Sequence, residues 1–94
     1  LKLDIGDLVS DWKLESVLGS GGMGKVFKGR RGEQVSAIKV LAPTVAADAT
    51  ARQRFEREID VTRKLEHPNI IKVFDSGVAQ VEDIQYPYMA MEFI

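Results

Sequence analysis

The chain has 94 residues, enough for one domain that buries about two-thirds of the surface exposed by the unfolded chain. Its 45% hydrophobic and 29% charged residues are ordinary for a soluble globular domain. Thirteen basic and fourteen acidic side chains give a net charge of −1, which excludes the basic patch of a typical nucleic-acid or anionic-membrane binder. The absence of cysteine excludes disulfides and thiolate metal sites, and it is compatible with a reducing compartment.

Residues 1–11 alternate only weakly between apolar and polar types, which predicts a lead-in segment that is either flexible or paired to a sheet edge. No apolar run reaches the roughly 20 residues that span a bilayer, and no signal-peptide pattern opens the chain. We therefore expect a cytoplasmic location and no membrane segment in this chain, while a membrane anchor further along remains an open question.

Residues 18–26 read Leu-Gly-Ser-Gly-Gly-Met-Gly-Lys-Val, which places three glycines in the register G-x-G-x-x-G-x-V. Lys39 follows thirteen residues after Val26. Glycine allows a backbone to approach a bulky anion and to point its amide hydrogens at phosphate oxygens, and the lysine adds a positive charge. This order and spacing predict a site for nucleotide phosphates.

The flanking residues distinguish this loop from two other glycine-rich nucleotide loops. Residues 12–18 and 24–30 both read as strands, whereas a Rossmann loop leads from a strand into a helix. A Walker loop requires Ser or Thr after its lysine, and here Val26 follows Lys25. The remaining alternative is a hairpin without a ligand, which four glycines in six residues disfavour because glycine loses the most conformational entropy on ordering.

Residues 51–66 contain helix formers and neither glycine nor proline, so we expect a helix there. At about 100° per residue, one face of this helix gathers the positions that would be buried. Those positions are Phe55, Ile59, Val61, Thr62 and Leu65. Glu58 falls in the middle of that face, where a carboxylate is costly unless a cation meets it, and Lys39 is the matching charge in an apolar strand. The pattern predicts a buried Lys39–Glu58 ion pair; the alternative is that both side chains reach solvent.

Together these features resemble the N-terminal lobe of the eukaryotic-type protein kinases, and the Gly-Gly-Met-Gly stretch is most similar to bacterial serine/threonine kinases. Residues 67–70, His-Pro-Asn-Ile, match the family's turn after the helix, and residues 88–94 match its fifth strand running into the hinge. The expected fold is α+β, a five-stranded antiparallel sheet with one packed helix. Its strands are expected at residues 12–19, 24–30, 35–41, 70–78 and 86–93. On this basis residues 12–94 form the lobe and residues 1–11 the lead-in.

The resemblance implies that Lys39 contacts the α- and β-phosphates of ATP and pairs with Glu58, which makes these two the candidate catalytic residues. The candidate phosphate-binding residues of the loop are Gly19, Ser20, Gly21, Gly22, Met23 and Gly24. ATP and Mg²⁺ are the implied cofactors, with the metal ligands outside this chain. One departure is Ser36, where the family usually has valine; its side chain is expected to face away from the nucleotide.

The resemblance also implies an adenine site on the same side of the sheet. Its residues would be Leu18, Val26 and Ala37 around the ring, Met91 as gatekeeper, and the main chain of Glu92 and Ile94 at the adenine edge. Because side chains alternate along a strand, Ala37 and Lys39 share one face. Adenine and phosphates would therefore be contacted from the same direction.

The kinase motifs H-R-D-x-x-x-x-N, D-F-G and A-P-E are absent from these residues, and Asp75-Ser76-Gly77 is expected to be a turn rather than a metal site. We expect the parent protein to transfer the γ-phosphoryl of ATP to a serine or threonine hydroxyl of a protein substrate bound through a second lobe. The 94 residues alone are expected to be inactive and to self-associate through exposed apolar positions. Two alternatives stay open, a nucleotide-sensing or scaffolding pseudokinase and a module that only binds a partner.

Overall fold

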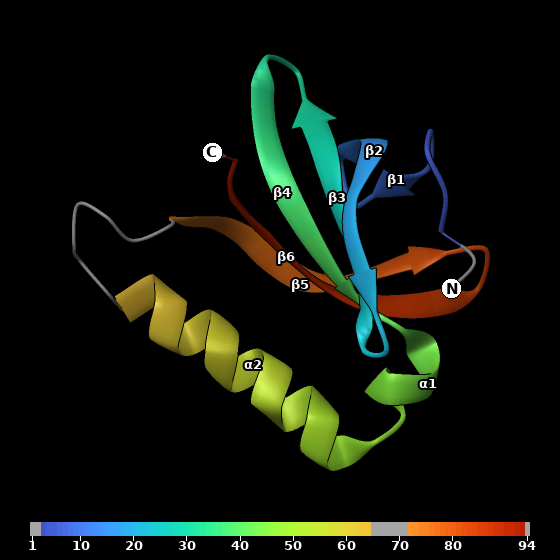
Figure 1. Cartoon of the computed structure of the whole chain (residues 1–94), viewed down its shortest axis with the longest axis vertical. Helices are drawn as coiled ribbons and strands as arrows, with labels where there is room; N and C mark the ends of the chain where they lie inside the picture. Colours follow the sequence, from blue (N-terminus) through green and yellow to red (C-terminus); the bar gives the residue numbers. More distant parts are fainter. Residues whose placement is uncertain (1–2, 65–71, 94) are drawn as a thin grey trace.

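The computed structural model describes residues 3–64 and 72–93, with residues 62–64 described by their backbone only. Within these ranges the chain forms one six-stranded sheet and two helices (Figure 1). The elements are β1 (Leu8–Val9), β2 (Trp12–Gly21), β3 (Gly24–Arg31), β4 (Gln34–Leu41), α1 (Pro43–Ala46), α2 (Ala49–Lys64), β5 (Val73–Val81) and β6 (Ile84–Glu92). The strand order is β1-β2-β3-β4-β6-β5, and each neighbouring pair is antiparallel. The predicted antiparallel sheet with one long packed helix is confirmed.

The short strand β1 adds a sixth strand to the five predicted. It pairs with the start of β2 through Leu8↔Lys13 and Val9↔Trp12, so the lead-in is paired to the sheet edge. Leu3 and Val9 are 2% and 0% exposed and belong to the main core. These residues therefore help to close the core, because burying each large apolar side chain contributes about 1.5–3 kcal/mol.

The hairpin between β5 and β6 differs from its predicted boundaries. The sequence predicts one strand that ends at residue 78 and a next strand that begins at residue 86. In the structure, β5 continues to Val81 and β6 begins at Ile84. A two-residue turn suffices because Glu82 and Asp83 both adopt positive φ, 50° and 66°, which matches the twist of a tight hairpin. Glycine usually supplies this conformation, and its absence here explains why the turn was not predicted. The predicted strand start at residue 70 lies outside the described residues.

The sheet has two different apolar faces. The face away from α2 carries the larger core, which is closed by the lead-in segment. That core comprises Leu3, Val9, Trp12, Leu14, Phe27, Ile38, Val40, Ala79, Tyr86, Tyr88 and Ala90. On the opposite face, Leu41 and Met89 pack with Phe55 and Ile59 of α2. This second, smaller core positions the helix over the sheet.

Three polar side chains interact beside the larger core: Arg31 of β3, Asp75 of β5 and Tyr88 of β6. Asp75-Ser76-Gly77 lies within β5 beside a register shift, so the predicted turn at these residues is wrong. The Tyr88 hydroxyl donates to Asp75 Oδ2 at 2.9 Å. Burial raises the pKa of the Tyr88 phenol; a hydrogen bond with Ser10 opposes this shift and the Asp75 carboxylate reinforces it. The Arg31 guanidinium stacks on the Trp12 ring at 4.2 Å, which covers the indole from solvent.

The helical region begins earlier than predicted and is divided. Pro43 opens the short α1, and α2 starts at Ala49, where Asp48 Oδ1 accepts from the backbone N–H of Thr50 at 2.9 Å. An aspartate in this position satisfies amides that the first helical turn leaves free.

The predicted buried face of α2 is confirmed at Phe55 and Ile59, which are 3% and 8% exposed. It is wrong at Val61, which is 51% exposed. The side chains of Thr62 and Leu65 lie outside the described residues. In the described part of the chain, neither helix combines the length and apolar character needed to cross a membrane.

We predict that Leu3→Ala lowers the free energy of unfolding by about 2–5 kcal/mol, because it removes a buried side chain from the larger core. Leu8→Ala is the matched control, since Leu8 lies in the same segment and is 56% exposed. Its effect should stay within about 0.5 kcal/mol. Urea unfolding of both variants measures the difference, and equal midpoints would contradict the assignment of the lead-in to the core.

Candidate functional site

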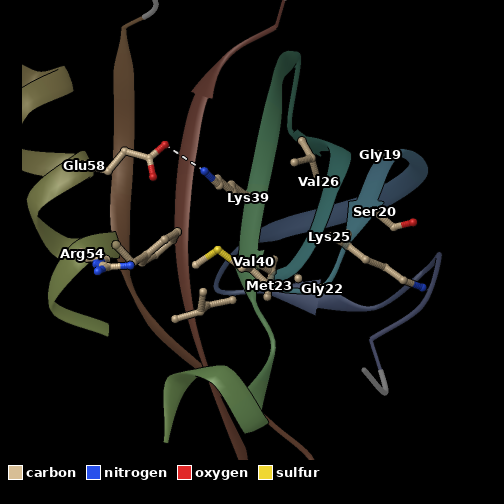
Figure 2. A pocket seen from close by; sticks show the side chains of 14 residues that line it. Gly19, Ser20, Gly22, Met23, Lys25, Val26, Lys39, Val40, Arg54 and Glu58 are labelled. Atoms are coloured by element: carbon tan, nitrogen blue, oxygen red, sulfur yellow. Dashed lines mark hydrogen bonds and ion pairs between the residues drawn. The ribbon is translucent and has the colours of Figure 1, made fainter. Parts of the chain in front are cut away.

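A cavity of about 370 Å³ lies between the glycine loop and α2 (Figure 2). The β2–β3 hairpin forms one wall, β4 forms the base, and α2 forms the opposite wall. The lining residues are Gly19, Ser20, Gly21, Gly22, Met23, Gly24, Lys25, Val26, Lys39, Val40, Leu41, Arg54, Phe55 and Glu58. The loop and the two charged residues singled out by the sequence thus meet in one place.

The glycine loop is the end of a strand pair rather than a free segment. Gly21 pairs with Gly24, which leaves a two-residue turn at Gly22 and Met23. A Cβ added at Gly21 or Gly22 would meet no atom within 4 Å, so the space beside these glycines is open to a ligand.

Gly24 is required for a different reason. A Cβ built there would lie 2.0 Å from the backbone oxygen of Val40, and the residue has φ of 158°. Its glycine allows β3 to approach β4 closely, a contact that the neighbouring Ala42 N–H extends by donating to Met23 O at 2.8 Å. The role in phosphate approach that the sequence suggested for Gly24 stays a prediction, whereas its role in strand packing follows from this contact.

The Lys39–Glu58 ion pair is present. Lys39 Nζ donates to Glu58 Oε1 at 2.8 Å across the space between β4 and α2, as Figure 2 shows. The prediction that this pair is buried is wrong, since 35% of the Lys39 side chain and 49% of the Glu58 side chain are exposed. The helix packs on the sheet through Phe55 and Ile59, and Glu58 lines the open cavity. A pair so exposed contributes at most about 1 kcal/mol to stability.

Of the described adenine residues implied by the resemblance, Val26 lines the cavity, and Leu18, Ala37, Met91 and Glu92 do not. Ala37 lies on β4 two residues from Lys39 and pairs with Met91 of β6. Leu18 falls at a register shift in β2 and is 47% exposed. The N–H of Glu92 donates to Lys72 O at 2.8 Å and is therefore already used, and Ile94 lies outside the described residues.

Several lining residues were not predicted as part of the site. Phe55 was expected on the buried face of the helix, and Lys25, Leu41 and Arg54 were given no role in the site. Arg54 precedes Glu58 by one helical turn, and residues four apart on a helix share a face, so the i,i+4 spacing was the available signal.

The lining carries three cations and one carboxylate, and the carboxylate is engaged by Lys39. The site therefore favours an anionic ligand.

Ser36 faces away from this cavity, as expected from its position on β4. It is 0% exposed, and its Oγ has no hydrogen-bond partner within the described residues. Among residues 3–64 and 72–93, no three His, Cys, Asp or Glu side chains gather in a way that could hold a metal ion.

Comparison with known proteins identifies the family. The family model described as "Protein kinase domain" matches residues 12–94. The chain belongs to the protein kinase domain family. It is 40% identical over 84 residues to a probable serine/threonine-protein kinase of Corynebacterium efficiens, covering 86% of this chain and 13% of that protein. It is also 40% identical over 85 residues to the serine/threonine-protein kinase Pkn3 of Myxococcus xanthus, covering 88% of this chain and 15% of that protein.

A solved structure agrees with this assignment. The kinase domain of PknI from Mycobacterium tuberculosis matches with a TM-score of 0.74 and 32% identity, covering 98% of this chain and 36% of that domain. The predicted fold, an N-terminal kinase lobe related to bacterial serine/threonine kinases, is confirmed. The chain spans only about a seventh of the length of the two curated relatives and about a third of the solved domain.

The two kinds of glycine in the loop predict different mutational effects. Gly24→Ala should lower the melting temperature by several degrees, because its Cβ collides with backbone that cannot move aside. Gly21→Ala should leave the melting temperature nearly unchanged, because nothing lies near its Cβ. Thermal unfolding followed by circular dichroism compares the two; a larger loss for Gly21→Ala would contradict this division.

Proposed function

We propose that the cavity binds the phosphates of ATP and that the protein containing this lobe transfers the γ-phosphoryl group to a serine or threonine hydroxyl of a protein. The observation that carries the proposal is the convergence of the glycine loop, Lys39 and Glu58 on one cavity. The names of the relatives, serine/threonine-protein kinases, support the choice of reaction.

The residues present fit the polyphosphate of a nucleotide. The open space beside Gly21 and Gly22 leaves room for phosphate oxygens next to backbone amides. Lys39 is held in place by Glu58 rather than left free, so its ammonium is oriented before the ligand arrives. Phosphoryl transfer depends chiefly on positioning and charge stabilisation, which this arrangement supplies through Lys39 and the loop.

The adenine base would lie further along the same sheet face. We propose that Leu18, Val26 and Ala37 contact the ring and that Met91 lies beside it. Ala37 and Met91 are paired neighbours on β4 and β6, which supports a continuous strip from base to phosphate. Mg²⁺, when bound with ATP, would neutralise phosphate charge; the described residues of this chain offer no acidic cluster to hold it.

We also propose the wider organisation of the protein. Residues 12–94 act as the nucleotide-binding lobe, and a second lobe supplies the substrate site and the metal ligands. The working compartment would be the cytoplasm, where ATP is available.

Replacing Lys39 by Met should abolish phosphoryl transfer by the intact protein and lower its stability by less than about 1 kcal/mol, because the ion pair is half exposed. Lys13→Met is the control, since Lys13 is an exposed cation on β2 that is absent from the cavity lining. Transfer of radiolabelled phosphate from ATP, together with ATP titration calorimetry, measures both effects. Wild-type turnover in Lys39→Met would contradict the proposal, and ATP binding without transfer in the wild type would indicate a nucleotide-sensing module instead.

The isolated 94-residue chain should self-associate and show no kinase activity. Leu18 is 47% exposed, and Val26, Ala37 and Met91 on neighbouring strands are partly exposed. Contiguous exposed apolar side chains promote association. Sedimentation velocity over a wide concentration range tests this. A monomer at every concentration would contradict the expected association, and measurable transfer would contradict the need for a second lobe.

A further inference from the structure

A lysine of β3 lies over an aromatic ring just beyond the end of β6. Lys28 Nζ is 5.4 Å from the centre of the Phe93 ring, within the range of a cation–π interaction. β4 separates β3 from β6, so the contact spans two interstrand spacings, about 10 Å. It therefore links two segments that strand pairing does not join directly.

Strand pairing shows which face of the sheet this link occupies. Lys28 pairs with Ala37, and Ala37 pairs with Met91, so these side chains form one row across β3, β4 and β6. Side chains paired across neighbouring strands lie on the same face. The next row holds Val26 and Lys39, which line the cavity. Lys28 therefore lies on the face proposed for the adenine base.

The Phe93 ring is the partner of the Lys28 ammonium. The ion pairs of the described residues use other cations, namely Arg30, Arg31 and Lys39. Glu92, which precedes Phe93, pairs with Ser36 and so lies on the opposite face of the sheet. Lys28 is partly buried and Phe93 is 39% exposed, so water surrounds their contact only in part.

Phe93 follows the last residue that the sheet holds. β6 ends at Glu92, whose pairing with Ser36 is the last pair between β4 and β6. Phe93 comes between Glu92 and Ile94, the two residues whose main chain is expected at the adenine edge. Main-chain groups bind a base more tightly when their segment is already ordered, because ordering it on binding costs free energy. The contact with Lys28 orders this segment from β3.

We propose that Lys28 is a positioning residue for the nucleotide base, which holds the segment after β6 through the Phe93 ring in the orientation that receives adenine. The inference rests on the proposed kinase function and concerns the base alone. The phosphates are assigned to Lys39 and the glycine loop, whose positions are set by β4 and the β2–β3 hairpin. Lys28 therefore determines the affinity for the base and not the rate of the chemical step.

Phosphoryl transfer to casein by the intact protein, with two competitors of ATP, separates the parts of the nucleotide. Adenosine carries the base without phosphates, and inorganic tripolyphosphate carries phosphates without the base. Lys28→Met should raise the KM for ATP and the inhibition constant of adenosine roughly fivefold, as expected for a partly exposed cation–π contact. The inhibition constant of tripolyphosphate and kcat should stay within about twofold of wild type. Because adenosine is uncharged, the loss of a positive charge alone would not weaken its binding.

Two further variants and a control test the contact itself. Lys28→Arg keeps a cation that can stack on the ring, so its KM for ATP should stay within about twofold of wild type. Phe93→Leu removes the ring and should reproduce the effect of Lys28→Met, and the double variant should be no worse than either, because both changes break one contact. Lys13→Met is the matched control, since Lys13 is an exposed cation of the adjoining strand β2, and it should leave every constant unchanged.

The role in positioning the base would be overturned by an unchanged adenosine constant in Lys28→Met, or by an equal rise in the tripolyphosphate constant. A Lys28→Arg variant that behaves like Lys28→Met, or a Lys13→Met variant with the same loss, would also overturn it. A wild-type protein that transfers no phosphate from ATP would instead overturn the proposed function, so the two failures are distinguishable.

Discussion

The alternation of side chains along β4 is the constraint on which the rest of the structure depends. β4 pairs with β3 on one side and β6 on the other, so its register is held by two ladders. Ile38 and Val40 enter the larger core and are at most 1% exposed, while Lys39 between them faces the cavity. A shift of one residue would exchange these faces and place a lysine in the core. The burial of Ile38 and Val40 therefore determines where the ammonium of Lys39 lies.

The ion pair follows from this packing rather than causing it. Leu41 and Met89 on the sheet bury Phe55 and Ile59 of α2, and the helix is thereby held at the distance at which Glu58 reaches Lys39. Burial of each such side chain stabilises by about 1.5–3 kcal/mol, whereas the half-exposed ion pair adds about 1 kcal/mol at most. Breaking the pair therefore takes little free energy, and Glu58 is well placed to orient the Lys39 ammonium. The ammonium stays partly exposed at the cavity, where an anionic ligand can meet it.

The loop combines open and closely packed positions within six residues. Gly21 and Gly22 leave space above the cavity, while Gly24 and the Ala42–Met23 hydrogen bond attach the turn to β4. The turn can therefore present amides toward the cavity without being a free segment. Its one long apolar side chain, Met23, is directed across the cavity toward α2 (Figure 2).

The sequence by itself determined the order of strands and helix along the chain, the glycine loop and the partnership of Lys39 with Glu58. These depend on local conformation and on period-two or helical spacing, which side-chain chemistry records directly. Only the tertiary structure decided that the pair is half exposed, that Leu3 and Val9 complete the core, and that Glu82-Asp83 makes the β5–β6 turn. It also decided that Gly24 serves strand packing and that Arg54 and Phe55 line the cavity. Apart from the turn, which lacks the usual glycine, these features depend on how α2, the lead-in and the strand ends meet across the sheet, and such contacts leave no periodic signal.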